Sequence, residues 1–194
     1  MARVPDWVAA TAGVEAIERL DARGPNVSQA NRYEPSPQGA VTGLLRRMDL
    51  DWSRYAFVDL GSGKGRALWE AAAWPFREVV GVEFAAELHA AAEALLRSAP
   101  AGTFQARSVR SVHGDATTWE PPAGPWVIYL FNPFSASVLA RALDRVLRDA
   151  RPEDDAWLLY LYPDHASVVI RDWRWELRGG EENSLVWELP AGRA

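Results

Sequence analysis

Hydrophobic residues recur along this chain with two different spacings. Five apolar segments have the length of β-strands, and the segments between them carry apolar residues at helical spacing. Two of the strand-like segments are apolar throughout, which is typical of strands buried on both faces of a sheet. The predicted strands are residues 55–60, 78–83, part of 105–116, 125–131 and 156–162, and the predicted helices are residues 39–48, 66–74, 85–99 and 136–150.

The two ends of the chain follow other patterns. An amphipathic helix is predicted from Pro5 to Leu20, and residues 21–39, which are rich in Gly, Pro, Asn and Ser, predict a loop. Near the C-terminus, residues 165–172 predict a short helix or a turn. Residues 173–177 and 184–190 then alternate like two antiparallel strands, with the residues between them as the turn. The chain is therefore expected to end in a β-hairpin.

Strands that alternate with helices and then give way to a hairpin predict an α/β fold. Parallel strands need right-handed crossovers and cover on both faces. We therefore predict a three-layer sandwich around a Rossmann-like, seven-stranded, mostly parallel sheet with a C-terminal antiparallel hairpin. We divide the chain into an N-terminal helix and lid segment, residues 1–38, and a single catalytic domain, residues 39–194.

Composition limits the kind of protein and its partners. A chain of 194 residues suits one domain, and no apolar run approaches the roughly 20 residues that span a bilayer. There are no cysteines, which excludes disulfides and thiolate chemistry, and no His, Asp or Glu cluster has metal-ligand spacing. The net charge of −5, without a block of Lys or Arg, argues against a nucleic-acid partner. We expect a cytoplasmic protein with no membrane contact and no metal.

A glycine-rich turn follows the first predicted strand. Residues 59–65 read DLGSGKG, which lacks the spacing of a phosphate-binding P-loop and places the third glycine one residue too early for a dinucleotide fingerprint. Gly61 and Gly63 allow a ligand to approach the backbone closely. Asp59 can accept a hydrogen bond from an ammonium group and would repel a pyrophosphate. The turn therefore favours a ligand that carries an amino-acid group. Lys64 is expected to point to solvent or toward the lid.

A second acid stands at the end of the second predicted strand. Glu83 has the place from which a carboxylate binds a ribose diol in dinucleotide folds, and the alternative is that it caps the helix that follows. Together, Glu83 and Asp59 predict a ligand with a nucleoside end and an amino-acid end.

Four segments together resemble the motifs of class I S-adenosylmethionine-dependent methyltransferases. They are VDLGSGKGR at 58–66, GVE at 81–83, HGDA at 113–116 and NPF at 132–134, in the family's order over about residues 30–189. The segment RYEPSPQGAVTGLLRRM, which precedes the first strand, resembles a group of small stand-alone bacterial methyltransferases. It is also similar in layout to the ATP-synthase c-subunit and the non-SET histone lysine methyltransferases, in which such a segment folds over the cofactor.

The resemblance implies S-adenosylmethionine as the cofactor and S-adenosylhomocysteine as the product. It implies that Asp115 meets the adenine amino group, although Asp115 is also placed to be an N-cap or a turn acid. The implied cofactor-binding residues are Tyr33, Asp59, Gly61, Ser62, Gly63, Gly65, Glu83, Phe84, Asp115, Ala116 and Asn132.

The NPF segment suggests the chemistry. Asn132 and the carbonyl of Pro133 can each accept a hydrogen bond from a substrate N–H, and Phe134 can pack on the substrate. This pattern implies N-methylation of an amine or amide of a small molecule or a protein side chain. Asn132 and Pro133 could instead form a turn that merely ends a strand. The alternatives are O-methylation of a small molecule and cofactor binding without turnover. His165, oriented by Asp164, is a candidate general base.

Overall fold

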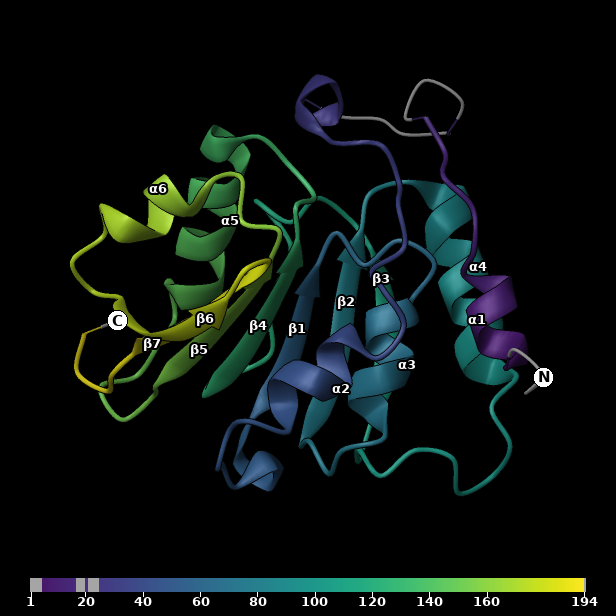
Figure 1. The fold of residues 1–194 in the computed structure, drawn as a ribbon, viewed down its shortest axis with the longest axis horizontal. Coiled ribbons are helices and arrows are strands. Elements are labelled where there is room, and N and C mark those ends of the chain that lie inside the picture. The colour runs from purple at the N-terminus through teal and green to yellow at the C-terminus, as the bar shows by residue number, and fades with distance from the viewer. Residues whose placement is uncertain (1–4, 17–19, 21–24, 194) are drawn as a thin grey trace.

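A seven-stranded sheet forms the middle layer of the protein (Figure 1). The computed structural model describes residues 5–16, 20 and 25–193. The strand order is β3-β2-β1-β4-β5-β7-β6, with β1 to β5 parallel and β7 antiparallel to both of its neighbours. The strands are β1 Ala56–Leu60, β2 Glu78–Glu83, β3 Val109–His113, β4 Trp126–Phe131, β5 Ala156–Leu161, β6 Glu176–Glu181 and β7 Ser184–Leu189.

Helices cover both faces of this sheet. The helices are α1 Asp6–Ala10, α2 Ala40–Leu45, α3 Arg66–Ala72, α4 Ala86–Arg97, α5 Ala136–Leu147 and α6 Ala166–Ile170, with 3-10 turns η2 Val27–Gln29 and η3 Trp52–Arg54. One buried cluster joins α2 and α3 to one face of the sheet, and a second cluster joins α5 and α6 to the other. The predicted three-layer α/β sandwich is confirmed. Within the described residues, no helix combines the length and the apolar character that a membrane crossing requires.

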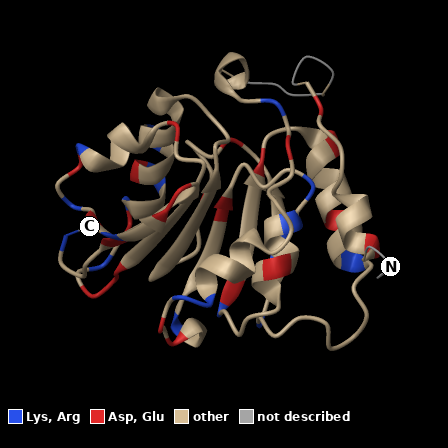
Figure 2. Cartoon of the chain, in the orientation of Figure 1, with Lys and Arg blue, Asp and Glu red and all other residues tan. Residues whose placement is uncertain are grey.

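The central strands are apolar on both sides. Every residue of β1 is buried, as is nearly every residue of β4 and β5, because each strand is covered by a helical layer on either face. Figure 2 shows charged residues spread over helices and loops around central strands that are mostly tan. Two carboxylates interrupt this apolar layer near the carboxyl ends of the strands, Asp59 on β1 and Glu83 on β2. Charges in such a place point to a function.

The prediction of a helix from Pro5 to Leu20 was wrong in its length. The helix ends at Ala10, where the Thr11 hydroxyl donates to the Trp7 carbonyl at 3.0 Å. Glu15 then pairs with Tyr33 in an antiparallel bridge, so tertiary contacts replace the helix that the sequence pattern favours. Residues 17–19 of the predicted helix, and 21–24 of the predicted loop, lie outside the described residues.

The C-terminal hairpin is confirmed, but its predicted boundaries were wrong. The first strand is Glu176–Glu181 instead of residues 173–177, and residues 182–183 form the turn instead of 178–183. The strand accommodates two glycines through a register shift between Leu177 and Gly179.

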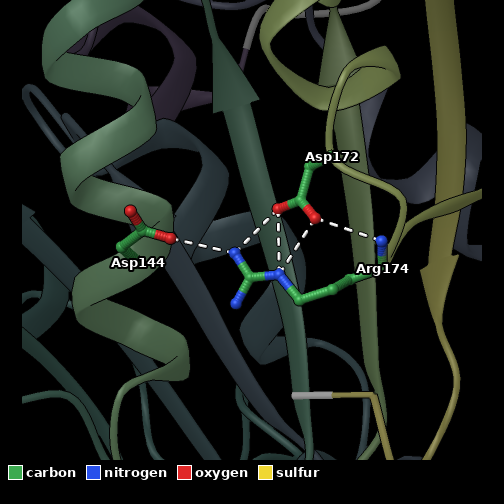
Figure 3. Close-up of polar contacts among 3 residues, drawn as sticks. All are labelled: Asp144, Asp172 and Arg174. Carbon is green, nitrogen blue, oxygen red and sulfur yellow. Dashed lines mark hydrogen bonds and ion pairs between the residues drawn. The ribbon is translucent and has the colours of Figure 1, made fainter.

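Arg174 joins the segment between α6 and β6 to helix α5. Its guanidinium donates to Asp144 at 2.9 Å and to Asp172 at 2.7 Å (Figure 3). Burial alone would raise the pKa of Asp172, but the hydrogen bonds from Arg174 hold that pKa below its usual range. This ion-paired group anchors the chain that leads from the end of β5 into the hairpin.

Arg66, the first residue of α3, holds the N-terminal segment against the domain. Its side chain is buried, and it donates to the Thr11 hydroxyl at 2.7 Å, the Ser36 carbonyl at 2.9 Å and the Val8 carbonyl at 2.9 Å. These acceptors come from two separate parts of the segment that precedes β1. One cation therefore fixes both parts beside the glycine turn.

We predict that Arg66→Ala lowers the free energy of unfolding by about 2–4 kcal/mol, because two buried acceptors and one partly buried acceptor lose their donor. Urea denaturation measures this change, and limited proteolysis should cut the variant within the segment before α2. Arg148→Ala, which removes an exposed arginine, is the matched control and should change neither readout. Equal stability of the two variants would contradict the anchoring role.

Candidate active site

A cavity of about 630 Å³ opens at the carboxyl ends of β1, β2, β4 and β5. Its volume is within the range of about 300–1,000 Å³ that is typical of small-molecule sites. The sheet changes its winding direction between β1 and β4, and open α/β sheets bind ligands at such a point. The chain before β1 runs past the ends of these strands in Figure 1. Its residues 31–37 form one wall of the cavity.

The glycine turn after β1 forms part of the floor. Gly61 and Gly63 have φ angles of +83° and +52°, which favour glycine. A Cβ atom at Gly61 would lie 2.5 Å from Cβ of Pro133, and one at Gly63 would overlap the ring of Tyr33. The sequence predicted that a ligand approaches the backbone of these glycines closely. In the structure, side chains from the loop after β4 and from the N-terminal segment make that close approach.

Asp59 is the most buried carboxyl group of the cavity. It is 3% exposed and accepts no hydrogen bond from any residue that the structure describes. Burial, and then the neighbouring charge of Glu83, raise the pKa of Asp59 to about 8. A carboxyl group in this environment gains strongly from a cationic partner, as the sequence analysis expected.

Two hydroxyl groups beside Asp59 also lack partners. Ser62 Oγ and Tyr129 Oη are fully buried and have no hydrogen-bond partner among the described residues, and both residues line the cavity. Buried polar groups in proteins are nearly always hydrogen-bonded. Three unsatisfied groups at one end of a cavity therefore indicate a polar ligand.

The sequence analysis missed Tyr129. Burial raises the pKa of the Tyr129 hydroxyl, and a contact with the Ser36 hydroxyl partly offsets that rise. The charges of Asp59 and Glu70 raise the pKa further. Tyr129 is the register partner of Asp59 across the β1–β4 pair, so both side chains point to the same face of the sheet. The available signal was a tyrosine in an otherwise apolar strand beside a strand that carries an acid.

Glu83 ties the glycine turn to the beginning of α4. Its carboxylate accepts from the Gly63 N–H at 2.8 Å and from the Ala85 N–H at 2.9 Å. Burial raises the pKa of Glu83, and these backbone hydrogen bonds oppose the rise. The second contact is to the residue that precedes α4 and not to an N–H of the helix itself. Each oxygen keeps a second lone pair that a ligand hydroxyl can use.

Asp115 is held by a turn and by the N-terminal segment. One carboxylate oxygen accepts from the Thr117 N–H at 2.8 Å and from the Thr117 hydroxyl at 2.7 Å. The other oxygen accepts from the Asn26 side-chain amide at 2.8 Å. Burial alone would raise the pKa of Asp115, but these hydrogen bonds lower it. Asp115 thus has the turn role that the sequence allowed, with an additional tie to Asn26.

A second, much smaller cavity lies beside Asp115. Its volume is about 20 Å³, which suffices for a single water. Phe84, Ala116 and Phe134 line it, and residues 26–30 cover it. The region where the resemblance expects adenine is therefore closed by the N-terminal segment.

The NPF segment makes different contacts from those expected. Asn132 accepts from the Tyr160 hydroxyl at 3.0 Å, and its amide group donates to Asp164. The carbonyls of Asn132 and Pro133 accept from the side-chain amide of Asn31 at 2.6 Å and from its backbone N–H at 3.0 Å. Asn31 therefore occupies the carbonyl acceptor of Pro133 that the sequence assigned to a substrate N–H.

The predicted site residues fall into three groups. Those that line the larger cavity are Tyr33, Asp59, Gly61, Ser62, Glu83, Phe84, Asn132, Pro133 and Phe134. Gly63 and Gly65 shape the turn, and Asp115 and Ala116 line only the smaller cavity. In the part of the chain that the structure describes, no three His, Asp or Glu side chains gather as metal ligands.

Lys64 points toward the N-terminal segment, one of the two directions that the sequence analysis allowed. Its ammonium group pairs with Glu15, donates to the Ala12 carbonyl at 3.3 Å and lies 5.1 Å from the centre of the Tyr33 ring. The Tyr33 hydroxyl donates to the Thr11 carbonyl at 2.6 Å. Lys64 therefore helps to hold Tyr33 over the glycine turn.

No protein-family model matches the chain, and no curated protein matches it either. Solved structures do match. An RNA methyltransferase from Salinibacter ruber with bound S-adenosylhomocysteine is 22% identical, with a TM-score of 0.57 over 81% of this chain and 94% of its own. The glycopeptide N-methyltransferase MtfA with S-adenosylmethionine is 13% identical, with a TM-score of 0.56 over 80% of this chain and 98% of its own. The chain has a methyltransferase fold.

A third match has no activity in its name. The PH0226 protein from Pyrococcus horikoshii OT3 is 14% identical, with a TM-score of 0.58 over 78% of this chain and 88% of its own. At such low identity the likeness extends to the fold and not to individual residues. The role of each side chain in this methyltransferase fold therefore has to come from its own geometry.

We predict that Asp59→Asn stabilises the ligand-free protein at pH 8. Because the folded-state pKa is about 8, well above the ordinary value of about 3.9, folding takes up a proton between these pH values. The stability that this proton confers is full below about pH 4 and is lost as the pH rises through 8. Urea denaturation at pH 5 and pH 8 should show a stability loss in the wild type that is about 1–3 kcal/mol larger than in Asp59→Asn.

Asp149→Asn is the control for this experiment, because Asp149 is an exposed acid at the end of α5. It should follow the wild-type pH profile. If Asp59→Asn also follows that profile, Asp59 is not a buried carboxyl with a raised pKa.

Proposed function

We propose that this protein is an S-adenosylmethionine-dependent methyltransferase that N-methylates an amine or amide of a small molecule or protein side chain. The observation that carries the proposal is the set of unsatisfied polar groups on the cavity floor. Asp59, Ser62 and Tyr129 lie together at the point where the sheet changes direction, and Glu83 lies on the neighbouring strand.

The cavity floor suits the amino-acid end of the cofactor. The Asp59 carboxylate would take the α-ammonium group, and the hydroxyls of Tyr129 and Ser62 would donate to the α-carboxylate. The free lone pairs of Glu83 would accept from the ribose hydroxyls. Similar structures hold S-adenosylhomocysteine or S-adenosylmethionine, which supports the same choice here.

The adenine end would use Phe84, Asp115 and Ala116. That use requires residues 26–30 to move off the smaller cavity and Asn26 to release Asp115. We therefore propose that residues 26–38 of the predicted lid segment alternate between covering the empty adenine site and covering bound cofactor.

When bound, the cofactor supplies an activated methyl group on a sulfonium. The residues of the chain then orient the methyl group and the acceptor and exclude water, because in-line transfer depends on both. Tyr33 and Pro133 pack on the glycine turn and shape the floor. Asn132, held by Tyr160, keeps Asp164 at the mouth of the cavity.

An N acceptor is favoured over an O acceptor because the described residues hold no His–Asp pair positioned as a general base. The Asp164 carboxylate bonds to Asn132 and not to His165, so Asp164 does not orient His165 as a general base. A hydroxyl acceptor needs a base, whereas an amine carries its own lone pair once it is neutral. A second candidate, cofactor binding without turnover, is favoured by Asn31, which occupies the Pro133 carbonyl.

Calorimetric titration with S-adenosylhomocysteine tests the proposal. The wild type should bind it, and Tyr129→Phe should bind it about 3–10-fold more weakly, because one hydrogen bond is lost. The stability of Tyr129→Phe should be unchanged, since its hydroxyl has no partner among the described residues. Absence of binding to the wild type would overturn the proposed function.

Two controls locate the effect. Tyr55→Phe removes a hydroxyl that donates to Asp155 at 2.6 Å, so it should lower stability and leave affinity unchanged. 5′-Methylthioadenosine lacks the amino-acid end of the cofactor, so it should bind equally to the wild type and Tyr129→Phe. A loss of methylthioadenosine affinity in Tyr129→Phe would contradict the assigned contact.

We predict that Asn26→Ala binds S-adenosylhomocysteine about 2–10-fold more tightly than the wild type. The covering segment competes with adenine for Asp115, and the variant loses the hydrogen bond that favours the covered state. Titration with 5′-methylthioadenosine should show the same gain, because that compound retains the adenine. Weaker binding would mean that Asn26 holds the cofactor instead of competing with it.

A further inference from the structure

The mouth of the larger cavity carries an aromatic pair. Phe131 ends β4 and Tyr162 follows β5, and their ring centres are 5.7 Å apart at an angle of 56°. Phe131 is half-buried, whereas Tyr162 is 41% exposed, so the pair presents an aromatic surface to whatever enters the cavity. Such surfaces attract alkyl chains and cations.

The turn that holds Tyr162 is fixed by several contacts. Tyr162 has a φ of +48°, and its N–H donates to the Asn183 carbonyl in the hairpin at 2.7 Å. The Asp164 N–H donates to the Tyr162 carbonyl at 2.8 Å. Asn132 binds one oxygen of the Asp164 carboxylate and leaves the other available at the mouth. The aromatic pair and a carboxylate are therefore held side by side.

The charges around the cavity favour a cation. Its lining includes the carboxyl groups of Asp59, Glu83, Glu34 and Asp164. The lining also includes two guanidinium groups, those of Arg32 and Arg66. Arg66 is buried with its donors engaged, and Arg32 pairs with Glu34 at 3.1 Å. An anionic acceptor would meet repulsion from Asp164 at the mouth.

The same site disfavours the binding of a flat amide or a nucleobase as the acceptor. The Asn132 and Pro133 carbonyls already accept from Asn31. Phe134 is 7% exposed, and its neighbour across an isolated bridge is Ala30, so its ring is not available for stacking on a substrate. The aromatic pair and Asp164 remain accessible at the mouth, beside the exposed ion pair of Arg32 and Glu34.

We infer that the acceptor is an aliphatic primary or secondary amine that arrives as an ammonium ion on a slender alkyl chain. The inference rests on the proposed function. The alkyl chain lies against Phe131 and Tyr162, and the nitrogen is directed to Asp164. The same chemistry occurs in free alkylamines and in lysine side chains.

The transfer balances as follows for such an acceptor. The ammonium releases one proton to water, and the nitrogen uses the freed lone pair to form the new N–C bond. The electron pair of the broken C–S bond stays on sulfur, which leaves S-adenosylhomocysteine. The positive charge passes from the sulfonium to the methylated nitrogen, where Asp164 stabilises it.

Ligand binding to the protein saturated with S-adenosylhomocysteine tests this inference. The probes are n-butylammonium, the neutral 1-pentanol and the anionic pentanoate, measured by NMR titration. Butylammonium should bind at least tenfold more tightly than either of the others. Asp164→Asn and Tyr162→Ala should each weaken butylammonium at least fivefold and leave the affinity for S-adenosylhomocysteine unchanged. Asp149→Asn, which changes an exposed acid just beyond the end of α5, should change neither affinity.

The outcomes separate the two proposals. Failure of S-adenosylhomocysteine to bind, read before any probe is added, overturns the proposed function. Normal cofactor binding with equal affinity for butylammonium and pentanol, or with no effect of Asp164→Asn, overturns the amine inference alone. Tighter binding of adenosine than of butylammonium at the mouth would also overturn it, in favour of a nucleoside acceptor. Nα-acetyl-lysine methylamide binding more tightly than butylammonium would identify a protein side chain as the source.

Discussion

The close approach of three chain segments at the glycine turn is the constraint on which the site depends. Gly61 and Gly63 adopt left-handed backbone conformations, and no side chain fits between them and Pro133 or Tyr33. The turn thereby brings together the end of β1, the loop after β4 and the segment before the sheet. Glu83 fixes the same turn through the Gly63 N–H. A substitution at either glycine would therefore displace the walls of the cavity along with the turn.

The segment before the sheet contributes to the site, because its residues 31–37 line the larger cavity. Arg66 and Lys64 hold it beside the turn, while Asn26 and Asn31 bond to Asp115 and to the loop after β4. Its contacts thus reach both the region proposed for adenine and the region proposed for the acceptor. Under the proposed function, the affinities for cofactor and acceptor are coupled through the position of this segment.

Strand and helix positions could be predicted from the sequence because periodicity reports burial directly. The places of Asp59 and Glu83 followed from the same pattern, since Asp59 is the next-to-last residue of one apolar strand and Glu83 is the last residue of another. Long-range contacts could not be predicted. The helix that begins at Asp6 stops early because Arg66 binds Thr11 and Tyr33 pairs with Glu15 in the chain beyond it. Tyr129 looked like an ordinary strand residue until its register with Asp59 was known.

The proposed function depends most on the polar side chains on the cavity floor that lack hydrogen-bond partners, because they would bind the amino-acid end of S-adenosylmethionine. A crystal structure of the complex with S-adenosylhomocysteine tests it most directly. We expect the α-ammonium group to lie at the Asp59 carboxylate, the α-carboxylate at the hydroxyls of Tyr129 and Ser62, and the ribose at Glu83. A complex in which the amino-acid end lies elsewhere, and in which Asp59, Tyr129 and Ser62 stay without partners, would contradict this assignment.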